Sequence, residues 1–119
     1  MGKKILLVED NEAWRRMAAE SLQDAGYEVI AVSCAAEVVL QKELTNLSLV
    51  VLDLDLGGEN GLMLMKHLKR YYPGIPIMIH TGMDPEEQAI QRMRDQGASL
   101  FLRKGPTSDF VAAVQKLAP

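Results

Sequence analysis

Residues 47–61 read Leu-Ser-Leu-Val-Val-Leu-Asp-Leu-Asp-Leu-Gly-Gly-Glu-Asn-Gly, and the fold follows from this stretch. Residues 49–52 form an apolar run rich in Val and Leu, which is typical of a strand buried on both faces. The run stops at Asp53, and the glycine-rich segment after it favours a turn. Open α/β sheets bind their ligands beyond the carboxyl ends of the strands. Asp53 therefore lies where a functional carboxylate is expected. We expect polar groups from other parts of the chain to lie close to it.

The bulk composition indicates one domain covering residues 1–119. Of the 119 residues, 48% are apolar and 24% are charged, which suffices for a single core. The net charge is −3 and the Lys and Arg residues are scattered, so we expect no direct nucleic-acid binding by this domain. Cys34 is the only cysteine, which excludes an internal disulfide. The apolar run at 5–8 is too short for a signal peptide or membrane span, so we expect a cytoplasmic protein without membrane contact.

Strand and helix patterns alternate along the chain. Apolar runs predict strands at residues 5–8, 27–32, 49–52, 77–80 and 100–102. Helical spacing of apolar residues predicts a helix after each strand. Asn11 is expected to cap the first helix. In the fourth helix, Asp84 is expected to be the cap, with Pro85 in the first helical position and Glu87 completing a capping box. The predicted apolar face of the second helix consists of Ala36, Val39, Leu40 and Leu44, and the predicted cap of the last helix is Thr107 or Ser108.

Five such strand–helix units predict an α/β fold. Buried strands joined through helices form a parallel sheet with helices on both faces. The expected architecture is a (βα)5 flavodoxin-like three-layer sandwich with a five-stranded parallel sheet in the order 2-1-3-4-5.

This topology gathers polar residues at one edge of the sheet. The residues that follow or end strands one, three, four and five are Glu9, Asp10, Asp53, Asp55, Thr81 and Lys104. Clustered carboxylates repel one another unless a cation lies between them, and Mg²⁺ suits a few carboxylates together with water and phosphate. Asp53 could then attack a phosphoryl group as a carboxylate nucleophile. Lys104 supplies positive charge, Thr81 supplies a hydroxyl, and Gly82 leaves room beside it.

The same residues resemble the receiver domain of two-component response regulators over the whole chain. The matching segments are Val8-Glu9-Asp10, Leu52-Asp53 with Gly61 eight residues later, Ile79-His80-Thr81-Gly82, and Gly97-Ala98 followed by Phe101 and Lys104. The resemblance implies that Asp53 accepts a phosphoryl group from a sensor histidine kinase or a histidine phosphotransfer protein in a phosphorelay. It also implies Mg²⁺ on Asp10, Asp53 and the backbone carbonyl of Asp55, with Glu9 acting through water.

The resemblance further implies how the signal leaves the domain. Thr81 and Phe101 would move together and change the face made by the fourth helix, the fifth strand and the fifth helix. That face would contact a downstream effector domain or protein, or a second copy of the domain in a homodimer.

Five positions depart from the family pattern. The family usually has proline where this chain has Gly57, so we expect a looser acceptor loop. Gly105 separates Lys104 from its proline, the switch aromatic is phenylalanine instead of tyrosine, and Asp55 is an additional acid. Met83 offers no polar group to a hydrolytic water, which favours a long-lived phosphoryl group.

Other interpretations account for single features. Glu9 and Asp10 taken alone could simply favour a helix start, and Thr81 alone could be a turn residue. Trp14 lies on the apolar stripe of the first helix and is interpreted as core or partial core. A small Mg²⁺-dependent aspartyl-phosphate phosphohydrolase is the alternative function, which Asp55 would suit, although 119 residues leave no room for a cap domain. A flavin-binding module is a weaker alternative, because acidic strand ends would repel the flavin phosphate.

Overall fold

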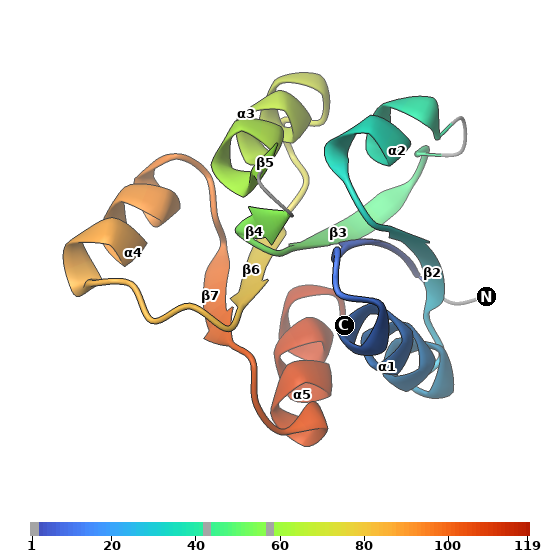
Figure 1. Ribbon diagram of the computed structural model, residues 1–119. Helices are drawn as coiled ribbons and strands as arrows, with labels where there is room; N and C mark the ends of the chain where they lie inside the picture. The colour runs from blue at the N-terminus through green and yellow to red at the C-terminus, as the bar shows by residue number, and fades with distance from the viewer. Residues whose placement is uncertain (1–2, 42–43, 57–58) are drawn as a thin grey trace.

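The protein forms a five-stranded parallel sheet covered by helices (Figure 1). The computed structural model describes residues 3–41, 44–56 and 59–119. The elements are β1 (Lys4–Val8), α1 (Glu12–Asp24), β2 (Glu28–Val32), α2 (Ala35–Leu40), β3 (Leu47–Leu52), β4 (Asp55–Leu56), β5 (Glu59–Asn60), α3 (Gly61–Tyr71), β6 (Ile77–Thr81), α4 (Glu87–Asp95), β7 (Leu100–Arg103) and α5 (Thr107–Leu117). The sheet order is β2-β1-β3-β6-β7, which confirms the predicted order of the five main strands.

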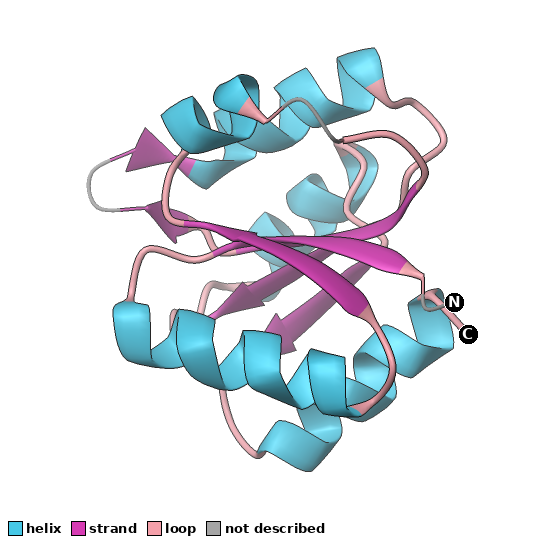
Figure 2. Ribbon diagram, turned by 90° about the vertical axis from the view of Figure 1, so that its right-hand side faces the viewer, coloured by secondary structure: helices cyan, strands magenta, loops and turns pink. Residues whose placement is uncertain are grey.

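The sheet lies between two layers of helices (Figure 2). A hydrophobic cluster packs on each of its faces. On one side, Ile5 and Leu7 of β1 pack with Leu22 of α1 and Val114 of α5. On the other side, alternate strand residues pack against α2, α3 and α4, with Met65 fully buried. Because both faces are covered, residues 5–8 of β1 and 49–52 of β3 are unbroken apolar runs instead of alternating ones. Residues 49–52 are at most 1% exposed, as their sequence predicted.

Local signals at α1 were interpreted correctly. The Asn11 side-chain oxygen accepts a hydrogen bond from the Trp14 backbone N–H at 2.9 Å, which is the predicted N-terminal cap. Gly26, with φ of +98°, follows the helix in the left-handed conformation that glycine adopts without a Cβ clash. The predicted cap of the last helix was wrong: α5 begins at Thr107, so its capping position is Pro106, which makes no side-chain cap bond.

The predicted apolar face of α2 was wrong. Val39 and Leu40 are 68% and 75% exposed, and Ala36 is also exposed, whereas Val38 is buried. The helix has only six residues, and Leu44 is buried in the segment that follows it. Successive helical residues are about 100° apart around the helix axis. In such a short helix, the burial of Val38 therefore turns the next two residues, Val39 and Leu40, toward solvent.

The predicted start of α4 was also wrong. The helix begins at Glu87, and its capping residue Glu86 makes no side-chain cap bond. The Asp84 side chain instead forms an ion pair with Arg103 at the end of β7, with Oδ1 and Nη1 3.6 Å apart. A cap contributes only about 1 kcal/mol, so the path of the chain from β6 can override a local capping motif. The antiparallel pair of β4 and β5 was not predicted, and the expectation of a looser loop at Gly57 falls outside the described residues.

Candidate functional site

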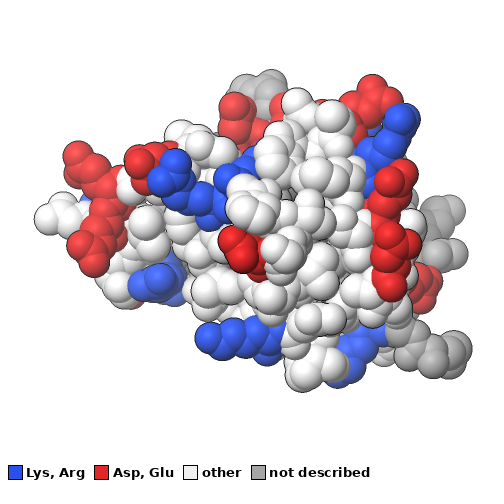
Figure 3. Space-filling view, turned by 90° about the horizontal axis from the view of Figure 1, so that it is seen from below, with Lys and Arg blue, Asp and Glu red and all other residues white. Residues whose placement is uncertain are grey.

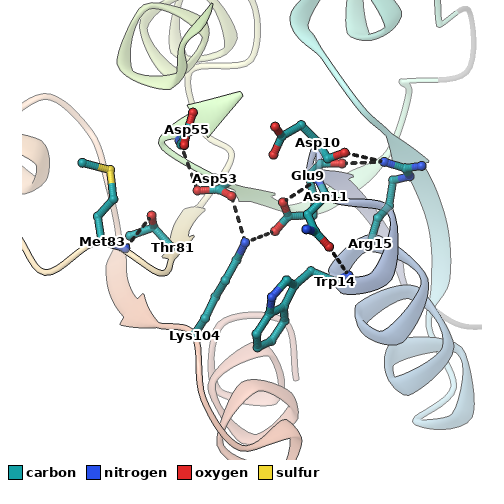
Figure 4. Close-up of polar contacts among 10 residues, drawn as sticks. All are labelled: Glu9, Asp10, Asn11, Trp14, Arg15, Asp53, Asp55, Thr81, Met83 and Lys104. Atoms are coloured by element: carbon teal, nitrogen blue, oxygen red, sulfur yellow. Dashed lines mark hydrogen bonds and ion pairs between the residues drawn. The ribbon is translucent and has the colours of Figure 1, made fainter. Parts of the chain in front are cut away.

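The carboxyl ends of four strands meet at a hollow on one edge of the sheet (Figure 4). Asp10 follows β1, Asp53 follows β3, Thr81 ends β6 and Lys104 follows β7. All four line the hollow, whose volume is about 670 Å³, together with Asn11, Glu12, Trp14, Asp55, Gly82 and Met83. The structure thus brings together the residues that the sequence placed at one sheet edge. Glu9 lies beneath the hollow, where it is 3% exposed.

Lys104 forms the centre of a buried ion-pair network. Its Nζ lies 2.6 Å from Glu9 Oε1 and 3.0 Å from Asp53 Oδ2. The three side chains are at most 11% exposed, so water screens their charges weakly. Two carboxylates share one ammonium, and the acidic side of the network therefore retains excess negative charge.

This network shifts the pKa of both partners of the shorter contact. Burial raises the pKa of Glu9 to about 7, because it outweighs the hydrogen bonds from Lys104 and from the Asn11 backbone N–H. Burial also opposes the charged form of Lys104, but the hydrogen bonds to Glu9 and Asp53 prevail and raise the pKa of Lys104. Lys104 consequently remains a cation at neutral pH.

The segment that carries the acidic pair is held mainly through its backbone. Glu9 Oε2 accepts a hydrogen bond from the Asn11 N–H at 3.1 Å. Arg15 Nη1 donates to the backbone carbonyls of Glu9 at 3.0 Å and Asp10 at 3.2 Å. The exposed Asp10 carboxylate is therefore presented to the hollow by a loop tied down from behind.

The Asp53 carboxylate is held through both of its oxygens. The Asp55 backbone N–H donates to Asp53 Oδ1 at 3.1 Å, and Lys104 pairs with Oδ2. The Asp53 side chain is 5% exposed, whereas Asp55 is exposed. Asp53 thus combines burial with a solvent-open hollow above it, which suits a nucleophile that meets a large substrate.

Three carboxylates are arranged to hold a hard cation. One oxygen from each of Glu9, Asp10 and Asp53 lies within 4.8 Å of the others. An all-oxygen, anionic donor set with an open side fits a divalent ion that keeps several waters, as Mg²⁺ does. The chemistry of the donor set therefore fits the expected metal.

The residues predicted to sense the site lie at different depths. Thr81 is 1% exposed, and its Oγ1 accepts a hydrogen bond from the Met83 backbone N–H at 3.2 Å. A Cβ at Gly82 would meet only the Lys104 stem, at 3.9 Å, so this position has room to spare. Met83 is 52% exposed at the rim of the hollow. Phe101 does not line the hollow, but is half-buried on β7 against the core beneath α4.

Two residues near the site, Trp14 and His80, make contacts that their sequence positions did not predict. Trp14, interpreted as core or partial core, is half-buried and also lines the hollow. His80, the residue before Thr81, is 4% exposed and stacks on Phe110 of α5 with ring centroids 4.6 Å apart. The one available sequence signal for Trp14 was its position three residues after the cap Asn11, next to the acidic pair.

The buried His80 is expected to make the free energy of unfolding depend on pH in the acid range. Burial lowers the pKa of His80 from 6.5 to about 4, and the nearby charge of Lys104 contributes to the same shift. The unfolded chain therefore takes up this proton first, so stability is fully present above about pH 6.5 and falls as the pH drops toward 4. Between about pH 7 and pH 5, the wild type should lose about 2 kcal/mol more than a His80→Phe variant, which keeps a stacked ring without a titrating proton.

Urea unfolding of both proteins at the two pH values measures this difference. The carboxylates that also titrate are common to both proteins and cancel in the comparison. An equal acid loss in the wild type and the variant would show that His80 does not titrate in this way.

Comparison with known proteins identifies the family. The family model of the response regulator receiver domain matches residues 5–115, and the chain belongs to this family. It is 36% identical over 106 residues to the response regulator protein FleR of Pseudomonas aeruginosa, covering 87% of this chain and 22% of that protein. It is 34% identical over 104 residues to the regulatory protein PhoP of Bacillus subtilis, covering 87% of this chain and 43% of that protein.

A solved structure supports the same conclusion. The non-phosphorylated HemR receiver domain from Leptospira biflexa superimposes with a TM-score of 0.89 at 26% identity, covering 98% of this chain and 94% of that one. The chain is a receiver domain of two-component signal transduction, a phosphoacceptor signalling module rather than a conventional enzyme. The chain spans less than half the length of these two curated relatives. In the part of the chain that the structure describes, no helix has the length and apolar character needed to cross a bilayer.

Proposed function

We propose that Asp53 is the phosphoacceptor of this receiver domain and that phosphorylation requires Mg²⁺. The observation that carries the proposal is the position of Asp53: its buried carboxylate pairs with Lys104 at 3.0 Å, lies beside an acidic pair and opens into a hollow of about 670 Å³. Asp55 lines the same hollow, but its exposed side chain makes it a less suitable nucleophile.

The proposed reaction transfers a phosphoryl group to one oxygen of Asp53. A bond forms between this oxygen and phosphorus, while the bond from phosphorus to the donor breaks and its electron pair leaves with the donor. The Asp55 N–H and the Lys104 ammonium hold the two carboxylate oxygens in the structure, which orients the nucleophile. As negative charge moves onto the phosphoryl oxygens, Lys104 and the Thr81 hydroxyl, which both line the hollow, would donate to them.

The metal would be held by Asp10, Asp53 and the backbone carbonyl of Asp55, with Glu9 acting through water. When bound, Mg²⁺ neutralises negative charge on the carboxylates and on the incoming phosphoryl group. Glu9 suits the indirect role, because it lies beneath the hollow and both of its oxygens already accept hydrogen bonds within the protein.

Receiver domains of this family are phosphorylated by histidine kinases, and the relative CqsS of Vibrio cholerae, 30% identical over 110 residues, is itself a sensor kinase/phosphatase. We assign this chain a sensor histidine kinase or a histidine phosphotransfer protein as donor. Its output surface would be the face of α4, β7 and α5. Thr81 and the half-buried Phe101 would move together and report phosphorylation to this face, where an effector or a second copy would dock. Support for this surface comes from its position next to Thr81, at the end of β6, which pairs with β7.

Intact mass after incubation with a small acyl phosphate tests the proposal. The wild type should gain one phosphoryl group when Mg²⁺ is present and none when it is chelated. An Asp53→Asn variant should gain none under either condition, because an amide is not a nucleophile of this kind.

Asp55→Asn is the matched control, since it removes the neighbouring acid of the same hollow and should still gain the phosphoryl group. Loss of the gain in Asp55→Asn but not in Asp53→Asn would move the acceptor to Asp55. Consumption of the donor over many turnovers without an adduct would favour the phosphohydrolase alternative. The decay of the adduct also checks the expected long lifetime, which the half-exposed Met83 suggests.

A further inference from the structure

The ammonium of Lys104 has a third partner besides the two carboxylates. Its Nζ lies 5.2 Å from the ring centroid of Trp14, within the range of a cation–π interaction (Figure 4). The Lys104 side chain is 11% exposed, so bulk water competes little for the ammonium. The indole face is thus an uncharged partner of the ammonium.

The position of Trp14 follows from the structure around it. The cap bond from the Trp14 N–H to Asn11 fixes its backbone in the first turn of α1, directly after the acidic pair. The indole then meets the His80 ring edge-on, with centroids 6.1 Å apart and an interplanar angle of 80°. His80 in turn stacks on Phe110, which is 3% exposed. An indole held at its backbone and at its edge presents a fixed face to Lys104.

Lys104 benefits from such a partner because Asp53, one of its two carboxylate partners, changes when the site is used. Under the proposed function, Asp53 becomes phosphorylated, and Asp10 and Asp53 take up a cation. The Lys104 backbone is anchored by its N–H, which donates to the Thr81 carbonyl at 2.7 Å, but the next residue is the exposed Gly105. A Cβ at Gly82 would lie 3.9 Å from the stem of Lys104, and glycine lacks this Cβ, so Gly82 does not brace the stem with a side chain. The face of Trp14 keeps the same charge whether the site is empty or occupied.

We propose that Trp14 is a positioning residue for phosphorylation, which holds the Lys104 ammonium beside the reacting carboxylate. This inference rests on the proposed function of Asp53. It assigns to the indole a task that Asp53 cannot perform throughout the reaction, because the Asp53 carboxylate is itself the reacting group. Glu9 and the indole face are the partners of the ammonium that do not react. The covering indole also excludes water from one side of the ammonium, which strengthens its attraction for phosphoryl oxygens.

The rate of phosphorylation by the acyl phosphate, in excess Mg²⁺, tests the proposal. Trp14→Leu keeps an apolar side chain but removes the ring face, and its rate constant should fall about tenfold. Trp14→Phe retains a ring face and should remain within about threefold of the wild type. Urea unfolding of each variant confirms that the protein compared is folded.

Fluorescence supplies a readout that does not depend on phosphorylation. Trp14 is the only tryptophan, so the emission of the protein reports this one indole. Replacing Lys104 by Met should change the emission intensity or maximum, because a positive charge leaves the ring face. Lys116→Met, which removes an exposed lysine of α5, should leave the emission unchanged.

The outcomes separate this inference from the proposed function. If the wild type gains no phosphoryl group, the proposed function fails, whereas the fluorescence comparison still tests the contact. If the wild type is phosphorylated and Trp14→Leu reacts equally fast, Trp14 does not position Lys104. Equal losses in Trp14→Leu and Trp14→Phe would also overturn the inference, since a ring face would then be insufficient. Unchanged emission in Lys104→Met would show that the contact is absent in solution.

Discussion

A Lys104→Met variant is expected to be phosphorylated at least about 100-fold more slowly than the wild type, and to lose about 3 kcal/mol of stability near neutral pH without Mg²⁺. The rate falls because a preorganised cation facing the transferred group is lost. The stability falls because Glu9 and Asp53 then share a buried site without a counter-charge, and breaking a buried pair on one side leaves its partner uncompensated. The rate of mass gain and urea unfolding measure the two effects.

Mg²⁺ should restore more stability to Lys104→Met than to the wild type. A bound cation would replace the missing ammonium as counter-charge, whereas in the wild type Lys104 already neutralises part of the network. Exposed Lys116 is the matched control, and Lys116→Met should change stability by no more than about 0.5 kcal/mol. A folded Lys104→Met protein with wild-type stability and rate would show that the ion-pair network has no role in either.

A Gly61→Ala variant is expected to lose about 2–3 kcal/mol of stability and to react at least about tenfold more slowly. A Cβ at Gly61 would lie 2.5 Å from the backbone oxygen of Asp53 and 2.9 Å from the Cα of Leu54. Both neighbours are backbone atoms, so no side chain can turn aside and the acceptor segment itself must move. Displacing Asp53 alters its distances to Lys104 and to the acidic pair, on which positioning depends.

Gly74→Ala is the control for Gly61→Ala. A Cβ at Gly74 would meet nothing within 4 Å, so this substitution should leave the rate unchanged and the stability equal or slightly higher. Urea unfolding and the rate of mass gain apply to both variants. If Gly61→Ala behaves like Gly74→Ala, the close approach of Gly61 to the acceptor segment is not maintained in solution.

The site was more predictable than some of the helices. Apolar runs such as residues 49–52 predicted the strands, because a strand covered on both faces admits hardly any polar residue. Strand order then placed Asp53, Thr81 and Lys104 at one edge, and the structure confirms that they line one hollow. The face of α2 and the start of α4 were wrong, because short helices and single caps carry little free energy against the packing of the whole chain.

The sequence by itself determined the alternation of strands and helices, the cap at Asn11 and the presence of Asp53 and its partners at the strand ends. These features depend on local pattern and on the topology that parallel strands require. Only the tertiary structure decided that Lys104 pairs with Glu9 as well as Asp53, that the face of Trp14 covers the ammonium, and that His80 is buried against Phe110. Each of these contacts joins side chains from different elements, and their distances depend on how the helices pack on the sheet, which no spacing along the chain encodes.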